Sequence, residues 1–206
     1  MRSLTDILYN FHWVVPGEAS RAMQAWAGGL GAFLEVRGIR AIINLRGRND
    51  DLSWWKKETA TAQSRGIAHL DAMLDSRKLP SREMLVRLIE TFNTAPKPFM
   101  LKCSGGQDRT SLAAALYIVF RDGWDALPTA RRQFARYPYL HFPKQQQRWL
   151  KAFMDFALED SGGLPLEQWI AQRYTPENLK AWLDAHGLQD GYAAIFTAPT
   201  RSPRQW

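Results

Sequence analysis

The strongest constraint on the fold lies in residues 99–111, where a short apolar run leads into a glycine-containing loop and then into a helical pattern. The run at 99–101 predicts a buried strand, and Gly105 with Gly106 predicts a tight turn after it. From Arg109 onward, apolar residues recur at helical spacing as far as Gly123. A strand that turns directly into a helix is a building unit of α/β proteins. This stretch therefore favours an α/β fold.

The segments before residue 99 repeat the alternation of strand and helix. They predict two short strands around Pro16-Gly17 and two buried strands further on, over residues 11–15, 19–23, 39–45 and 67–74. Helices are expected over residues 25–37 and 52–65, and Pro80-Ser81 is expected to open a third. Together these elements predict a central, mostly parallel, mixed sheet flanked by helices.

The part of the chain after residue 124 has a different pattern, with no convincing strand. Four helices are expected there, over residues 127–136, 145–158, 166–173 and 176–186. The best internal boundary is Ser161-Gly162-Gly163. We therefore expect one domain over residues 1–160 and an extension of helices over 161–206, packed on the same domain. Residues 196–206, with two prolines and no periodicity, are expected to form a loose tail.

Composition excludes several other classes of protein. With 46% apolar and 23% charged residues, the chain resembles globular rather than disordered proteins. No apolar run is long enough to span a bilayer and the N-terminus does not read as a secretory signal, so a cytoplasmic location is expected. The single cysteine, Cys103, excludes an internal disulfide. The four histidines are too far apart in sequence for a metal-ligand spacing, so no metal site is expected.

Basic residues are concentrated in the first three quarters of the chain. Residues 1–150 hold 22 Lys and Arg against 13 Asp and Glu, whereas residues 151–206 hold 5 against 7. A basic body indicates an anionic partner such as nucleic acid, acidic lipid or a phosphorylated substrate. Basic and aromatic residues interleave over residues 131–148, as in some RNA-binding proteins. Because no recognised RNA-binding motif accompanies them, no specific nucleic-acid partner is expected.

The loop after the 99–103 strand has the composition of an oxyanion site built around a nucleophile. Cys103 ends the strand, and Arg109 follows six positions later at the expected start of a helix. Backbone N–H groups of such a loop, together with the helix N-terminus, favour a thiolate and bind an anion. The Arg109 guanidinium can hold two oxygens of a phosphoryl group. The hydroxyl of Thr110 can donate to the sulfur and help it to leave.

Residues 103–110 resemble the Cys-x5-Arg-Thr/Ser signature loop of the cysteine-dependent tyrosine and dual-specificity phosphatases. The resemblance extends over roughly residues 10–160. The segments at 10–17, 38–46 and 79–85, together with Arg21 and Gln24, are similar to parts of small atypical dual-specificity phosphatases. It implies a phosphotyrosine-phosphatase-like fold, and hydrolysis of phosphate monoesters through a phosphocysteine without metal or other cofactor. It also implies that phosphate binds to the loop residues, Ser104, Gly105, Gly106, Gln107, Asp108 and Arg109.

Two positions of the loop depart from this family pattern. The residue before the cysteine is usually His, but here it is Lys102. An ammonium group at this place can itself favour the thiolate. The residue before the arginine is acidic, Asp108, as in myotubularin-type phosphoinositide phosphatases and some bacterial phosphatases.

Three aspartates are candidates for the general acid that protonates the leaving group. In the resembling family this residue lies about 30 positions before the cysteine, and Asp75 lies 28 positions before it. Asp71 lies 32 positions before it, within an expected strand, and Asp108 could act from inside the loop. Asp75 is the first choice, followed by Asp108.

The sequence thus predicts a cysteine-dependent phosphatase, most directly one acting on phosphotyrosine, phosphoserine or phosphothreonine in proteins. A phosphoinositide or inositol-phosphate phosphatase is the alternative favoured by Lys102, Asp108 and the basic body. A pseudophosphatase that binds a phosphorylated partner without turnover is a second alternative, because the usual His is missing. Burst kinetics with an aryl phosphate would separate the enzymes from the other classes.

Overall fold

A five-stranded sheet forms the centre of the computed structural model, which describes residues 3–25 and 29–197. Its strands, in spatial order, are β1 (His12–Val15), β2 (Ala19–Met23), β6 (Phe99–Cys103), β3 (Ala41–Asn44) and β4 (Ala68–Asp71). Only β1, at the edge, runs antiparallel to its neighbour. The prediction of a central, mostly parallel, mixed sheet is therefore confirmed.

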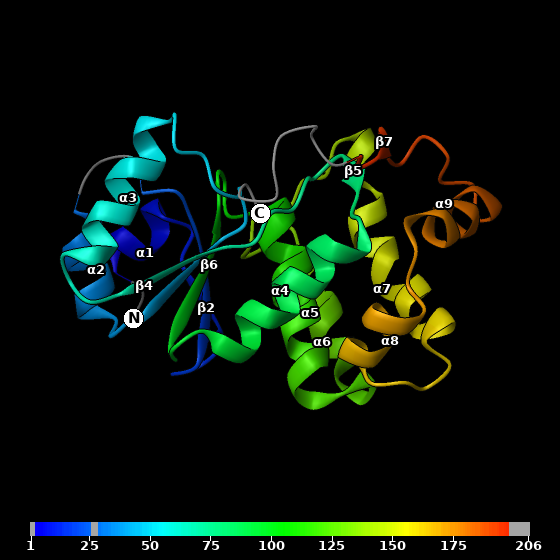
Figure 1. Ribbon diagram of the computed structural model, residues 1–206, viewed down its shortest axis with the longest axis horizontal. Helices are drawn as coiled ribbons and strands as arrows, with labels where there is room; N and C mark the ends of the chain where they lie inside the picture. The colour runs from blue at the N-terminus through cyan, green and yellow to red at the C-terminus, as the bar shows by residue number, and fades with distance from the viewer. Residues whose placement is uncertain (1–2, 26–28, 198–206) are drawn as a thin grey trace.

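Helices cover both faces of this sheet, as Figure 1 shows. On one face lie α1 (Leu4–Leu8), α2 (Leu30–Val36) and α3 (Ser53–Gln63). On the other lie α4 (Arg82–Thr94) and α5 (Asp108–Asp122), followed outward by α6 (Leu127–Arg131), α7 (Trp149–Ser161), α8 (Leu166–Gln172) and α9 (Pro176–Ala185). Because both faces are covered, every residue of β3 and β6 is buried, which explains why both strands are largely apolar apart from Asn44 and Lys102.

The boundaries of several elements follow from local chemistry that the sequence shows. The α4 helix begins after Ser81, whose side chain accepts a hydrogen bond from the Met84 N–H, as its position after Pro80 predicted. The helix expected over 127–136 ends at Arg131, where a 3₁₀ turn, Arg132–Phe134, follows. The helix expected over 145–158 begins only at Trp149, after the 3₁₀ turn Gln145–Gln147, and continues to Ser161.

Two predictions need correction. The helix expected from residue 25 begins at Leu30, because Gly29 has a left-handed backbone (φ 69°) that ends helical continuity; residues 26–28 lie outside the described ranges. No strand was expected after residue 124, yet β7 (Ala194–Ile195) pairs with β5 (Lys78–Leu79). This pairing joins segments more than 100 residues apart, which local sequence patterns do not report.

The C-terminal helices share an apolar cluster with α5. Trp149, Phe153 and Phe156 of α7 pack with Trp169 of α8 and with Tyr174, and all five side chains lie in the same cluster as α5. On this basis we propose that residues 161–206 extend the domain formed by 1–160. The expected loose tail lies almost wholly outside the described residues.

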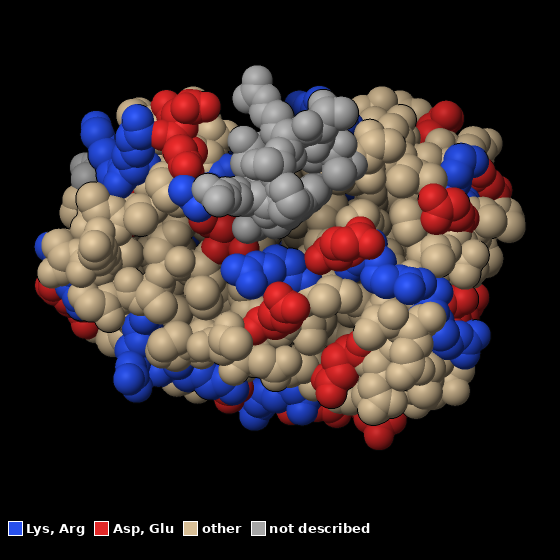
Figure 2. Space-filling model, viewed as in Figure 1, with Lys and Arg blue, Asp and Glu red and all other residues tan. Residues whose placement is uncertain are grey.

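Charged side chains of both signs are mixed on the face shown in Figure 2. None of the helices within the described ranges is long and apolar enough to cross a bilayer.

Candidate active site

The cysteine loop connects the end of the central strand to the start of the longest helix. Cys103 is the last residue of β6 and is 3% exposed, and α5 begins at Asp108. Gly106 adopts a positive φ of 61°, and a Cβ on it would lie 2.6 Å from the Met23 backbone nitrogen. No other residue fits this close approach to β2 without moving the backbone. The predicted strand, glycine turn and helix are thus present.

Donors behind the loop hold its carbonyl oxygens. The Gln24 N–H donates to Ser104 O (3.2 Å), and Asn10 Nδ2 donates to Gly106 O (3.0 Å). Arg21 Nη2 donates to the same Gly106 oxygen (3.0 Å) and to Gln107 O (3.1 Å). Because the carbonyl and the N–H of a peptide point in opposite directions, holding the loop carbonyls toward Asn10, Arg21 and Gln24 turns the loop N–H groups away from these residues. An anion nest requires N–H groups arranged in this way.

Arg21 is the main side chain that holds this loop in place by hydrogen bonds, and it is completely buried. Beyond the loop carbonyls, its Nη2 donates to the hydroxyls of Thr110 (3.2 Å) and Ser111 (2.9 Å). Its Nη1 donates to both the backbone and side-chain oxygens of Gln133 (2.9 and 3.1 Å). Burial lowers the pKa of Arg21 to about 10, so the group stays charged at neutral pH. The sequence resemblance included Arg21 but gave it no role.

The arginine of the signature folds back over the loop. Arg109 Nη2 donates to Ser104 Oγ (3.1 Å), and Nη1 lies 3.5 Å from Leu45 O. Its guanidinium therefore lies beside the loop that begins at Cys103. Thr110 is fully buried and donates its hydroxyl to Gln107 O (3.1 Å), so the expected donation to the Cys103 sulfur is not made in this structure.

Asp108 is the first residue of α5, and its side chain is partly buried. Its carboxylate accepts a hydrogen bond from Gln147 Nε2 (3.1 Å) and lies 3.5 Å from His141 Nε2. Burial raises the pKa of Asp108, against the attraction of His141 and Arg109. A carboxyl that holds its proton to higher pH beside the loop can act as an acid.

The other two aspartates lie outside the loop. Asp75 Oδ1 accepts hydrogen bonds from the N–H groups of Arg77 (2.7 Å) and Lys78 (3.1 Å), which shape the turn before β5. Asp71 ends β4 and accepts from Asn44 Nδ2 (2.6 Å) and Trp55 Nε1 (3.1 Å). Asp71 therefore has a structural function in joining β3, β4 and α3.

Gln147, which sequence reasoning missed, connects the segments of Asp75 and Asp108. Its Nε2 donates to Asp108 Oδ2 and to Ser76 Oγ, both at 3.1 Å, and Ser76 follows Asp75 directly. Its Oε1 accepts from the Lys144 N–H (2.8 Å), which fixes the amide orientation. Gln147 thus links Asp108 to the segment that carries Asp75, the first-choice acid candidate.

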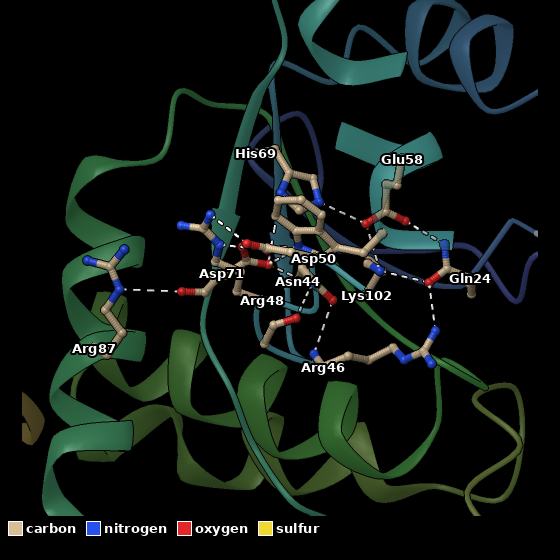
Figure 3. A network of polar contacts seen from close by, with 12 residues as sticks. Gln24, Asn44, Arg46, Arg48, Asp50, Glu58, His69, Asp71, Arg87 and Lys102 are labelled. Atoms are coloured by element: carbon tan, nitrogen blue, oxygen red, sulfur yellow. Dashed lines mark hydrogen bonds and ion pairs between the residues drawn. The ribbon is translucent and has the colours of Figure 1, made fainter. Parts of the chain in front are cut away.

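Lys102, the residue in place of the usual His, points into a buried polar network on the α3 side of the sheet (Figure 3). Its Nζ lies 2.7 Å from Glu58 Oε1 and donates to Gln24 Oε1 (2.8 Å). Glu58 also accepts from Gln24 Nε2 (2.6 Å) and His69 Nε2 (2.9 Å). The network joins Lys102 to Gln24, whose backbone braces the cysteine loop.

In this network, burial and ion pairing shift the pKa values of the charged side chains in opposite directions. Burial lowers the pKa of Lys102 to about 8, although Glu58 attracts its proton. Burial alone would raise the pKa of Glu58, but hydrogen bonds and charge from His69 and Lys102 lower it overall. Glu58 is therefore an anion that keeps Lys102 charged at neutral pH.

A separate cavity of about 720 Å³ lies between α2 and α3. Gln24, Trp54 and Glu58 contribute to its wall, but Cys103 and Arg109 do not line it. It is thus adjacent to the Lys102 network and distinct from the cysteine loop. The described residues contain no group of three or more His, Cys, Asp or Glu side chains that could hold a metal ion.

Solved structures identify the fold. No family model and no curated protein sequence matches the chain. TpbA from P. aeruginosa superposes with a TM-score of 0.58 at 17% identity, covering 80% of this chain and 92% of TpbA. The catalytic core of Siw14 gives 0.55 at 17% identity (87% and 92% covered), and PTPMT1 gives 0.53 at 12% identity (70% and 94% covered).

The chain has the fold of the cysteine-dependent phosphatases. This likeness confirms the phosphotyrosine-phosphatase-like fold that residues 103–110 implied. Within this phosphatase fold, Cys103, the loop and Arg109 come together at the end of β6 as the sequence predicted. Arg21, Glu58 and Gln147 complete the surroundings, and no spacing rule in the sequence would have found the last two.

Proposed function

We propose that the protein is a cysteine-dependent phosphatase that hydrolyses phosphate monoesters through a phosphocysteine at Cys103. This proposal rests on the hydrogen bonds that hold the cysteine loop in place. Donors from Asn10, Arg21 and Gln24 hold its carbonyls from behind, and Arg109 folds over it from the front. Such a loop presents N–H groups and a guanidinium to the three oxygens of a phosphoryl group.

The proposed reaction has two steps. The Cys103 thiolate attacks phosphorus while the bond to the ester oxygen breaks, and a carboxyl group gives that oxygen its proton. The resulting carboxylate then takes a proton from water, which attacks the phosphocysteine and releases phosphate and the thiolate. Arg109 and the loop amides bind the phosphoryl oxygens in both steps.

Asp108 and Asp75 are the two candidates for the carboxyl. The raised pKa of Asp108 and its place in the loop support it, because it remains protonated at higher pH than an exposed aspartate. Asp75 retains the sequence position typical of the family and lies beside Ser76, which shares Gln147 with Asp108. We propose that one of these two protonates the leaving group.

Phosphorylated side chains of proteins and inositol phosphates are both candidate substrates. TpbA has been crystallised with phosphotyrosine, whereas Siw14 is described as a PP-IP phosphatase. Arg46 adds a second cationic side chain near Cys103, besides Arg109, and this favours the second class for this chain. A cytoplasmic location suits a thiolate nucleophile, since thiols there remain reduced.

The test of this function is hydrolysis of a chromogenic aryl phosphate in the presence of a metal chelator. The parent is expected to turn over, Cys103→Ser to be inactive yet to bind vanadate, and Arg109→Lys to lose both turnover and vanadate affinity. Absence of turnover with retained vanadate binding in the parent would instead indicate a pseudophosphatase. Unchanged turnover in Cys103→Ser would refute the mechanism.

A further inference from the structure

His141 is a buried histidine near the cysteine loop that has no part in the reaction proposed above. It is 3% exposed, and its ring packs edge-on against Phe134, with the two ring centres 5.4 Å apart. Its Nε2 lies 3.5 Å from Asp108 Oδ1 and has no hydrogen-bond partner among the described residues. A buried polar atom without a partner is costly, so this nitrogen calls for a partner close by.

The other ring nitrogen determines what kind of partner Nε2 needs. Nδ1 lies 3.3 Å from the backbone oxygen of Phe134, and because a carbonyl oxygen only accepts, Nδ1 carries the proton of the neutral ring. Burial lowers the pKa of His141, and so do the nearby cations Arg21 and Lys151. The attraction of Asp108 opposes this shift without outweighing it. The ring is therefore neutral near neutral pH, and its Nε2 presents a lone pair to Asp108.

The carboxyl of Asp108 has the complementary arrangement. Gln147 Nε2 donates to Asp108 Oδ2 (3.1 Å), so a proton on this carboxyl lies on Oδ1, the oxygen that faces His141. Burial raises the pKa of Asp108. Positive charge on His141, Arg109 and Arg21 acts in the opposite direction but is the weaker influence. A carboxyl O–H and a lone pair on Nε2 thus face each other.

The segment that carries His141 is held against the cysteine loop. Asn10 Nδ2 donates to Gly106 O in the loop (3.0 Å) and to Tyr139 O (3.1 Å), two residues before His141. The Arg21 guanidinium lies 4.5 Å from the centre of the Tyr139 ring. These contacts hold the imidazole in place beside the carboxyl before any substrate binds.

We propose that His141 is a positioning residue for the general acid, because its Nε2 accepts a hydrogen bond from the protonated carboxyl of Asp108 and keeps that carboxyl protonated in the free enzyme. During the reaction the proton moves from Oδ1 to the ester oxygen as the P–O bond breaks, and Asp108 regains a proton from the attacking water. His141 itself neither gains nor loses a proton. The inference rests on the proposed function and assigns its acid to Asp108 rather than to Asp75.

The pH profile of kcat/KM tests this role, because it reports the ionisation of the free enzyme. His141→Asn keeps a side-chain N–H for the Phe134 oxygen but removes the acceptor that faces Asp108. A hydrogen bond to the protonated form raises the pKa of a carboxyl, so its loss should move the alkaline limb about one pH unit lower. At a fixed pH on that limb, kcat/KM for an alkyl phosphate should fall about tenfold, whereas an activated aryl phosphate should change less than about threefold.

His186→Asn is the matched control, because His186 is an exposed histidine whose Nδ1 likewise lies near a backbone oxygen, that of Trp182 (2.7 Å). It should leave the alkaline limb within about 0.3 pH units of the parent protein. A folded His141→Asn protein with the alkaline limb of the parent would overturn the proposal. So would a shift in His186→Asn as large as that in His141→Asn.

A double variant tests whether His141 acts through Asp108. Adding His141→Asn to Asp108→Asn should change kcat/KM less than about threefold, because the two residues act as one unit. A further loss of about tenfold would show that His141 acts elsewhere and would overturn the proposal.

Nitrogen NMR of the parent protein judges the pairing without any turnover. At about pH 7 the His141 ring should be neutral, with its proton on Nδ1. A proton on Nε2, alone or together with one on Nδ1, would overturn the proposal.

The failure of this inference and the failure of the proposed function give different results. If aryl phosphate hydrolysis depends on Cys103 but Asp108→Asn keeps the alkaline limb, the inference alone is refuted. If the parent protein does not hydrolyse aryl phosphate, the proposed function is refuted, and the NMR measurement still decides whether His141 and Asp108 are paired.

Discussion

Replacing Arg21 by methionine tests whether the loop is shaped from behind. Gly106 O would retain its hydrogen bond from Asn10, and Gln107 O would retain one from the Ser111 N–H. The two oxygens of Gln133 lose the donor that Arg21 supplies. Leaving two buried acceptors unpaired costs about 2–6 kcal/mol in total.

Removal of the buried charge offsets part of this cost. The fall in the pKa of Arg21 to about 10 corresponds to about 3 kcal/mol by which burial disfavours the charged side chain. The net change in the free energy of unfolding therefore lies between a gain of about 1 kcal/mol and a loss of about 3 kcal/mol. The Arg21 guanidinium keeps its proton below a pH of about 9 in both the folded and the unfolded chain. The effect of Arg21→Met on the free energy of unfolding should therefore not vary with pH between about 6 and 9.

Catalysis should suffer much more than stability. Without Arg21 the carbonyls of the loop are no longer held by a charged donor, and we expect kcat/KM for an aryl phosphate to fall at least about 100-fold. Urea unfolding and steady-state kinetics on the same preparation measure both effects. Arg37→Met is the control, because Arg37 is a well-bonded arginine that pairs with Asp6 and stacks on Phe33 away from the loop. A folded Arg21→Met protein with kcat/KM within about threefold of the parent would refute this reasoning.

Three further predictions concern the site. Replacing the general acid by Asn should slow the hydrolysis of alkyl phosphates far more than that of activated aryl phosphates, and should flatten the alkaline limb of the kcat/KM profile against pH. Comparing Asp108→Asn with Asp75→Asn shows which of the two residues is the acid. A normal pH profile in both variants would exclude both residues. Lys102 has a pKa of about 8 when folded against an ordinary 10.5, so the parent should gain about 3 kcal/mol of unfolding free energy as pH rises between these values. Lys102→Met should lack that gain in urea titrations, and equal slopes would contradict the assignment. Peroxide should inactivate the protein rapidly by oxidising Cys103, with early rescue by thiol and protection by phosphate; an unmodified Cys103 in active protein after exposure would indicate an inert thiol.

The fold could be predicted largely because its strands are short, apolar and separated by strong turn signals. The stretch over 99–111 specified a strand, a tight loop and a helix, and β6 and α5 occupy those positions. Ser81 and Gly123 similarly marked the ends of helices that the structure contains. Local chemistry determined each of these features, so a single sequence was sufficient.

The surroundings of the site could not be predicted in the same way. Glu58 lies on the face of α3 that meets Lys102, and only the packing of α3 on the sheet brings the two together. Gln147 lies in a 3₁₀ turn that was expected to be helix, and it reaches Asp108 from 39 positions away. Such contacts depend on how distant elements pack, and neither spacing nor propensity encodes them.

In the proposed mechanism, Cys103 carries the phosphoryl group between the two chemical steps. Rapid mixing of the protein with excess aryl phosphate, followed by acid quenching and mass spectrometry, measures this directly. We expect a burst of about one aryl alcohol per protein chain and a phosphoryl group on the peptide that contains Cys103. Steady turnover at the parent rate without a burst, and with Cys103 unmodified at every quench time, would contradict it.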